Sequence, residues 1–486
     1  MRLEVRHRGD AHTGKHNRRG ESHVRAMRNS LDHRSTPSSG ARRLVTLLLS
    51  GLLTVGVLAG PAHSAAPSSG PSSGNKAPHT PHGLRVPADF FGLHDGSTRS
   101  YDHLTFGSVR FWDAGVTWKD VETAPGVYSW ARLDSLVSAA QRHGVEATMV
   151  LAMTPSFYAS SATLPPTHLS HYTDFVRAVM TRYRHFNGSR GIDAFKVWNE
   201  GNVPCFWTGM PHRLAQLTRI VDRVRDQVDP GAQVVAPSFA VRLPYQQRWL
   251  ADYESQRVGG SPVWRYVDAN ALSLYPQATY HGRIGGPEDA MRLLSQVRRR
   301  LAHVGVPAGL PIQATEVNYG LASGGPVGAA AATPISEKRQ VANVLRTFLL
   351  GAARRLTKVF WYRYDWSYVP SSGGTLGNTL LTTPGQWDQV TPAGQAVDTA
   401  RRWLHGRLVG VGGHRPCAAN SVGTYTCVVS WSGGRRTIMW NPTHRVDVDV
   451  RGASYVKRPG HPRTAVDGRA ASIPVGYLPV VVVRAR

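Results

Sequence analysis

The sequence predicts a (β/α)8 barrel, the TIM-barrel fold, followed by a small C-terminal β-sandwich domain. Three observations lead to this prediction. The chain has 486 residues, which is more than a single barrel usually needs. Eight short apolar runs alternate with amphipathic stretches over residues 87–405. From residue 406 to 486 the alternation gives way to strands separated by turn residues.

The eight apolar runs have the length and composition of buried parallel strands. We expect them at Phe90–Leu93, Ser108–Phe111, Ala147–Leu151, Phe195–Trp198, Gln233–Ala236, Ala271–Leu274, Ile312–Thr315 and Val359–Tyr362. Apolar residues between them recur at helical spacing, as in the stripe of Leu133, Leu136, Val137 and Ala140. An open, doubly wound sheet is the rival fold, but no glycine fingerprint follows the first strand.

The C-terminal region begins after a last helix expected at residues 391–404. Its expected strands are Thr424–Trp431, Arg436–Trp440, Val446–Val450 and Leu478–Val483. Cys417 and Cys427 stand ten residues apart in a strand–turn–strand pattern, so either a disulfide or two buried thiols fits them.

The N-terminal region has the pattern of an export signal. Residues 1–66 form a basic leader in which Arg42 and Arg43 precede the apolar run of residues 44–60, and small residues follow. Met27 is an alternative start. A Ser/Pro/Gly-rich linker is expected at residues 67–86. The pattern predicts a secreted protein, with an uncleaved anchor and association with the cell envelope as alternatives.

The formal net charge of +26 raises the question of a nucleic-acid partner. We do not expect one, because the arginines are scattered over the predicted helices and form no single stripe. The 21 histidines include no H-E-x-x-H motif and no close ligand cluster, so we expect no catalytic metal and no cofactor. The sequence does not indicate an oligomeric state.

Two glutamates end predicted strands of the barrel. Glu200 ends the fourth strand, in Val-Trp-Asn-Glu, and Glu316 ends the seventh, in Ala-Thr-Glu-Val-Asn. Because active sites of (β/α)8 barrels lie at the carboxyl ends of the strands, both carboxylates are expected in one mouth. Glycoside hydrolysis needs such a pair: one protonates the leaving oxygen, and the other attacks the sugar or activates water.

The sequence resembles clan A of the glycoside hydrolases over about residues 90–405. Asn199-Glu200 resembles the clan's Asn-Glu pair, which implies that Glu200 is the acid/base and that Asn199 binds the sugar 2-hydroxyl. Glu316 resembles the nucleophile, and Arg110 the arginine that supports it. Trp361 resembles the tryptophan under the sugar. A further run resembles one that follows the second strand in several member families: Trp118, Glu122, Gly126, Tyr128 and Trp130.

The chain departs from the clan after the sixth strand. Many members carry His-x-Tyr there, whereas this chain has Ser273-Leu274-Tyr275, so Tyr275 fits either position and is expected to contact the nucleophile. Trp112 and Trp207 follow strand ends and are candidates to stack on sugar. The resemblance is nearest to the β-xylosidase-like family 39 or a family 5-like enzyme.

These features predict a secreted retaining enzyme that cleaves β-linked glycosides of the xylan or glucan type, with a carbohydrate substrate as its only expected partner. The sequence does not specify the sugar, the linkage, or endo versus exo action. The rival functions are a carbohydrate-binding protein on an inactive barrel and a structural protein of the cell envelope.

Overall fold

The computed structural model describes residues 83–277, 279–280, 283–319, 335–364, 381–383, 386–466 and 472–484. The predicted leader and signal segment of residues 1–66 lies outside them, as does most of the predicted linker. No helix within the described residues is long and apolar enough to span a membrane.

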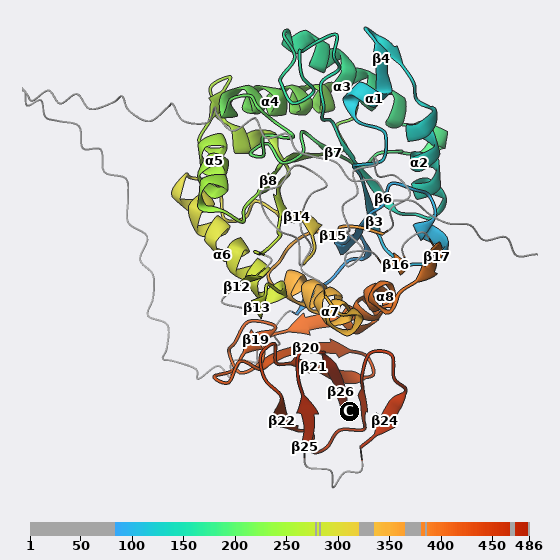
Figure 1. Cartoon of the computed structure of the whole chain (residues 1–486), viewed down its shortest axis with the longest axis vertical. Coiled ribbons are helices and arrows are strands. Elements are labelled where there is room, and N and C mark those ends of the chain that lie inside the picture. The colour runs from blue at the N-terminus through green and yellow to red at the C-terminus, as the bar shows by residue number, and fades with distance from the viewer. Residues whose placement is uncertain are drawn as a thin grey trace, which may run out of the picture. The chain divides into compact units, whose positions relative to one another are not determined.

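The predicted barrel is confirmed. Eight parallel strands close on themselves, and the helices form a ring around them (Figure 1). In chain order they are β2 (Phe91–His94), β3 (Ser108–Phe111), β6 (Glu146–Val150), β7 (Ala194–Lys196), β8 (Gln233–Ala240), β11 (Ala269–Ser273), β14 (Ile312–Val317) and β15 (Val359–Trp361). Each overlaps one of the eight predicted runs.

The helices of the ring bury the stripes seen in the sequence, including Leu133, Leu136, Val137 and Ala140. They are α2 (Ala131–Arg142), α3 (Leu169–Tyr183), α4 (Pro211–Val228), α5 (Pro244–Glu254), α6 (Pro287–His303), α7 (Glu337–Ala353) and α8 (Pro392–Leu404), with the one-turn α1 (Trp118–Val121) before α2.

The first strand–helix unit departs from the expected eightfold repeat. Between β2 and β3 the structure has only a 3-10 turn, Ser100–Asp102. The segment from Asp95 to Gly107 is short and rich in Gly, Ser and Asp, which favour turns over helix.

The loops of the barrel contain short pairs of antiparallel strands. Three further 3-10 turns lie between the strands and helices. The pairs are β4–β5 (Glu122–Ala124, Val127–Tyr128), β9–β10 (Arg257–Val258, Ser261–Pro262), β12–β13 (Thr279–Tyr280, Arg283–Ile284) and β16–β17 (Thr382–Thr383, Gln386–Val390). The 3-10 turns are Ala88–Phe90, Phe186–Gly188 and Val263–Tyr266.

The C-terminal domain consists of one large antiparallel sheet and one small one. The large sheet contains β18 (Arg407–Val409), β19 (Ala418–Ala419), β20 (Tyr425–Trp431), β21 (Gly434–Trp440), β23 (Tyr455–Lys457), β24 (Arg463–Ala465) and β26 (Val480–Arg484). The small sheet pairs β22 (Val446–Asp449) with β25 (Ser472–Val475). One boundary differs from the prediction. Leu84–Arg85, expected in the linker, form strand β1 at the edge of the large sheet, paired with β18.

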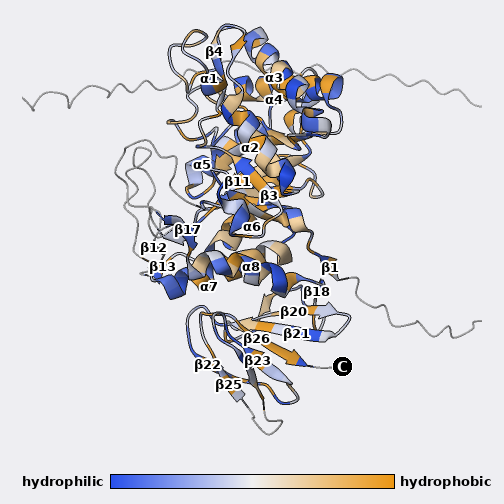
Figure 2. Cartoon of the chain, turned by 90° about the vertical axis from the view of Figure 1, so that its right-hand side faces the viewer, coloured by the Kyte–Doolittle hydropathy of each residue, from blue (hydrophilic) through white to orange (hydrophobic). Residues whose placement is uncertain are grey.

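Strand alternation makes the large sheet apolar on both faces. In β26, which Figure 2 colours as hydrophobic, Val481 and Val483 join the main core that also contains barrel helices, while Val480 and Val482 pack with the small sheet. Successive residues of a strand point to opposite faces, so a continuous apolar run is expected where both faces are covered.

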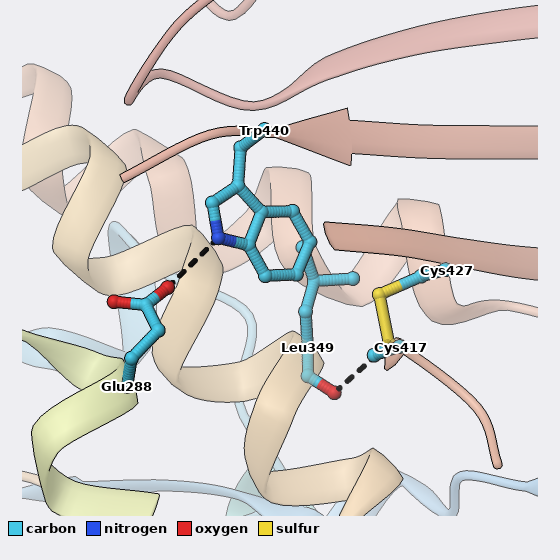
Figure 3. The surroundings of a disulfide bond; sticks show 5 residues. All are labelled: Glu288, Leu349, Cys417, Cys427 and Trp440. Carbon is cyan, nitrogen blue, oxygen red and sulfur yellow. Dashed lines mark hydrogen bonds between the residues drawn. A yellow bond between two sulfur atoms is a disulfide. The ribbon is translucent and has the colours of Figure 1, made fainter. Parts of the chain in front are cut away.

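A buried polar cluster joins the barrel to this domain. Trp440 of β21 donates its indole N–H to Glu288 of α6 at 2.8 Å (Figure 3). Arg346 of α7 donates Nε to the same carboxylate oxygen at 2.9 Å. Burial raises the pKa of Glu288, but the charge of Arg346 and the hydrogen bonds from Arg346 and Trp440 together outweigh burial, so the pKa lies below its ordinary value.

Cys417 and Cys427 form a disulfide, so the thiol alternative is wrong. Both residues are buried, and Cys417 Sγ lies 3.7 Å from the carbonyl oxygen of Leu349 in α7 (Figure 3). The bond closes a loop of ten residues beside the contact between the domain and the barrel.

Replacing both bonded cysteines with serine is expected to lower the free energy of unfolding by about 2–3 kcal/mol, because the unfolded chain then regains the entropy of the open loop. Thermal unfolding with and without reductant measures this loss. Cys205→Ser is the control, since Cys205 is exposed and unbonded. Equal unfolding temperatures for the double variant and the wild type would contradict the prediction.

Candidate active site

The two glutamates lie at the carboxyl ends of β7 and β14, two strands that β8 and β11 separate in the closed barrel. Glu316 is on β14 itself and only 6% exposed. Glu200 follows β7 by four residues and is partly exposed. Ser238 of β8 fixes this strand end, because its hydroxyl accepts the Glu200 backbone N–H at 2.9 Å and its backbone N–H donates to the Trp198 carbonyl at 3.1 Å.

Arg110, at the end of β3, connects the two strand ends. Its guanidinium donates from Nη1 to Glu316 Oε1 at 2.7 Å and from Nη2 to Asn199 Oδ1 at 2.6 Å. Asn199 Oδ1 also accepts the Ser238 hydroxyl at 3.1 Å. Since arginine only donates, the Asn199 amide orientation is fixed, and its NH2 group is left to donate to a ligand.

Tyr275, after β11, contacts the other oxygen of Glu316. Its hydroxyl donates to Oε2 at 2.9 Å, so both oxygens of Glu316 accept hydrogen bonds and one donor is a cation. Such surroundings suit a carboxylate anion. Arg242 donates to the backbone carbonyl of Tyr275 at 3.3 Å, with its guanidinium 5.8 Å from the tyrosine ring.

His94, at the end of β2, is a site residue that the sequence reasoning missed. Its Nδ1 lies 3.2 Å from Arg110 Nη1 and must accept, because arginine cannot. Its Nε2 therefore carries the proton and donates to the Trp112 carbonyl at 2.5 Å. Burial, reinforced by Arg110, holds the pKa of His94 well below its ordinary value, so the ring is a neutral acceptor.

Asp113 and Tyr362 were also missed. The Tyr362 hydroxyl donates to Asp113 Oδ2 at 2.9 Å, and the Tyr362 ring meets the Tyr275 ring edge-on at 6.5 Å. Burial, with the nearby charge of Glu316, raises the pKa of Asp113. A third carboxyl group thus lies in the electrostatic field of Glu316.

Lys196 of β7 lies inside the barrel beneath these groups. It is fully buried, and its Nζ donates to Thr315 Oγ1 at 3.2 Å. Burial, together with Arg110, lowers the pKa of Lys196 well below its ordinary value. A lysine in an otherwise apolar strand was not a predicted site residue.

The pKa of Glu200 is raised to near neutral pH, as a general acid requires. Burial, followed by the charge of Glu316, raises its pKa to about 7, and the cations Lys196 and Arg110 oppose this only in part. The two carboxyl groups therefore differ: Glu316 is held by donors, whereas the raised pKa leaves a large fraction of Glu200 protonated near neutral pH.

The three tryptophans predicted to contact sugar are all buried in protein contacts. Trp361 is fully buried beside Tyr319 at 6.0 Å, Trp207 meets Trp198 edge-on at 5.0 Å, and Trp112 meets Phe206 at 5.7 Å. A sugar contact for these rings stays a prediction.

The run from Trp118 to Trp130 builds a loop after β3. Glu122 accepts the Trp118 indole N–H at 2.6 Å, the Gly126 N–H at 2.8 Å and the Tyr158 hydroxyl at 2.8 Å. Gly126 turns the β4–β5 hairpin with a φ of 72°, which favours glycine. This run therefore shapes the mouth and supplies no group to the two glutamates.

No three His, Cys, Asp or Glu side chains gather as a potential metal site within the residues that the structure describes.

Several solved structures of glycoside hydrolases share this fold. The GH39 β-xylosidase from Caulobacter crescentus aligns with a TM-score of 0.58 at 15% identity, over 84% of this chain and 98% of that one. The GH39 enzyme from Xanthomonas axonopodis pv. citri gives 0.55 at 16% identity, over 83% and 96%. The chain shares their fold. A GH30 endoxylanase from Clostridium papyrosolvens C71 gives 0.51 at 12%, over 83% and 98%.

No protein-family model matches the chain, and no curated protein is similar to it in sequence. The similarity to the solved structures establishes the barrel with its additional β-domain. Function must be argued from the site.

Proposed function

We propose that this protein is a retaining glycoside hydrolase of the clan A type that acts on β-linked glycosides. The observation that carries the proposal is the unlike pair of carboxyl groups in one barrel mouth. Glu316 accepts hydrogen bonds from Arg110 and Tyr275, whereas the pKa of Glu200 is raised to about 7. A nucleophile must be ionised and an acid must hold a proton, and these environments provide both states.

In the first step a Glu316 oxygen attacks the anomeric carbon, and the bond to the leaving oxygen breaks as Glu200 protonates that oxygen. In the second step Glu200 removes a proton from water, which attacks the same carbon and releases Glu316. Two inversions leave the anomeric configuration unchanged. The free NH2 group of Asn199 donates to a sugar hydroxyl, held in place by Arg110 and Ser238.

Glu200 must act as an acid in the first step and as a base in the second. The causes of its raised pKa explain how it can do both. The charge of Glu316 is the second of these causes, after burial. Once Glu316 is esterified by the sugar, that charge is gone and the pKa of Glu200 falls. Glu200, which has given its proton to the leaving oxygen, therefore stays ionised and is ready to act as the base.

Activity is expected to fall as pH rises through about 7, because the first step needs protonated Glu200. The kcat/KM of an aryl β-glycoside with a poor leaving group, measured from pH 4 to 9, checks this basic limb. Titration of Glu200 by NMR in Glu316→Gln should show a lower pKa than in the wild type. An unchanged pKa would contradict the proposed coupling.

The function itself is tested by a screen of residues 66–486 against aryl β-glycosides and β-linked polysaccharides. Proton NMR of the first product identifies the anomer. The proposal expects cleavage with a β-anomer released first. Release of the α-anomer would contradict retention. A folded protein that binds glycans and cleaves none would support the carbohydrate-binding alternative.

For substrate and location we propose a β-linked xylan- or glucan-type glycoside outside the cell. Xylosidases and xylanases are among the named structures with this fold, and the Cys417–Cys427 disulfide suits an oxidising environment. The predicted signal of residues 44–66 is tested by sequencing the N-terminus of the protein recovered from culture medium.

A further inference from the structure

A groove outside the two glutamates is lined mainly by cationic and amide side chains. It has a volume of about 660 Å³ and runs between α5 and α6, which lie side by side in Figure 1. Four arginines and one histidine face one acidic residue, Asp289. The lining residues on which the inference depends are Arg242, Gln247, Asp289, Gln296, Arg299 and Arg300.

The negative charge of Asp289, the acidic residue in the groove lining, is already paired with arginines. Asp289 accepts two hydrogen bonds from Arg283, at 2.7 and 2.9 Å, and one from the Gly286 N–H at 2.8 Å. Arg292 also donates to it. Asp289 is buried by these contacts and cannot balance the remaining arginines.

Arg299 and Arg300 provide the uncompensated charge. Neither side chain forms an ion pair or hydrogen bond within the described part of the chain, and the Nε of Arg300 is enclosed without a partner. Arg292, Gln296 and Arg299 follow at intervals of four and three, so they share one face of α6. Arg292 and Arg299 are separated by about 10 Å along the helix at 1.5 Å per residue.

The groove begins at the barrel mouth. Arg242, which lines the groove, donates a hydrogen bond to the backbone carbonyl of Tyr275. The hydroxyl of Tyr275 in turn donates to Glu316 in the mouth. The charge of Glu200 also acts on Arg242 and partly offsets the effect of burial, which lowers the pKa of Arg242. Gln247 and Gln296 lie 3.3 Å apart, amide nitrogen to oxygen, and present amides suited to sugar hydroxyls.

We propose that this groove binds carboxylate groups of a uronic-acid-bearing β-glycan whose chain leaves the mouth over α5 and α6. The proposal rests on the proposed glycosidase function and adds the substrate class. Guanidinium groups bind carboxylates through paired, charge-assisted hydrogen bonds. Among the described residues, the groove lining includes no Phe, Tyr or Trp side chain on which bases could stack, which favours a glycan over a single-stranded nucleic acid.

The test compares glucuronate-substituted xylan with the same polymer after reduction of its carboxyl groups. We expect Arg299→Gln/Arg300→Gln to lower kcat/KM on the charged polymer about tenfold and to leave the reduced polymer and a small aryl β-glycoside unaffected. Arg223→Glu on α4 is the control, because it removes the same two units of charge at an exposed position away from the groove. It should change none of the three rates.

Two results would overturn the inference. One is an equal kcat/KM ratio of charged to reduced polymer in the wild type and the double variant. The other is stronger competition by an RNA oligonucleotide or a sulfated glycan than by the carboxylated one. If no substrate at all is cleaved, the proposed function fails, and gel retardation of Glu316→Ala by the two xylans still tests the groove separately.

Discussion

Replacement of Glu316 with alanine is expected to lower kcat on an aryl β-glycoside by about 10⁴-fold or more, because no other group can attack the anomeric carbon. Arg110 and Tyr275 would then donate into the space that the carboxylate occupied. A small anion such as azide should enter it and restore part of the rate, giving an α-glycosyl azide from a β-glycoside. Steady-state kinetics and NMR of the product measure both effects.

Glu316→Gln is the matched comparison for this experiment. It keeps the volume of the side chain and leaves no space for azide, so it should be equally inactive without rescue. Substantial activity in either variant without added azide would exclude Glu316 as the nucleophile.

Replacement of Glu200 with glutamine is expected to have an effect that depends on the leaving group. A substrate whose leaving oxygen must be protonated should lose about 10²–10⁴-fold in kcat/KM. An activated aryl glycoside, whose leaving group departs without a proton, should lose little in the glycosylation step. Release of the sugar should become rate-limiting, since water lacks its base, and a burst of phenol should appear. In Glu200→Ala, which leaves space beside the sugar, added azide should give a β-glycosyl azide.

Stopped-flow measurement of the released phenol shows the burst. A series of aryl glycosides with different leaving groups shows how the loss in kcat/KM depends on the leaving group. An equal loss for all leaving groups, with no burst, would mean that Glu200 acts on binding or folding instead of proton transfer. Cys205→Ser, which changes an exposed side chain on the same loop, is the control and should alter neither quantity.

The barrel was predictable because its strands are buried on both faces and read as continuous apolar runs. β3 has the predicted bounds, Ser108–Phe111. β8 runs four residues beyond the prediction, to Ala240, because Pro237 and Ser238 were not recognised as strand residues. Strand β1 has only two residues, and its pairing with β18 depends on a contact more than 300 residues away, which local sequence does not encode.

The placement of Arg110, Glu200 and Glu316 at or just after strand ends was predictable from the apolar runs that precede them, whereas their roles stay a prediction. The contacts of His94, Lys196 and Ser238 were not predictable, because the local sequence does not show which of these side chains the closed barrel brings into the site. The signal for His94 and Lys196 was an ionisable side chain within an apolar run. Such a residue is expensive to bury and should have prompted a search for its partner.

Trp118, Glu122 and Gly126 contributed to the family resemblance, but the structure gives them a structural role. Their contacts fix the fold of one loop. A sequence motif can thus reflect packing as well as chemistry, and only the three-dimensional contacts separate the two.

Covalent trapping tests the central claim most directly. A 2-deoxy-2-fluoro β-glycoside with a good leaving group should slow both steps and accumulate the glycosyl-enzyme. Mass spectrometry of the digested protein is predicted to show one sugar attached to the peptide that contains Glu316, and none in Glu316→Gln. A sugar attached to another residue, or steady turnover without any adduct and with inversion of the anomer, would contradict the account.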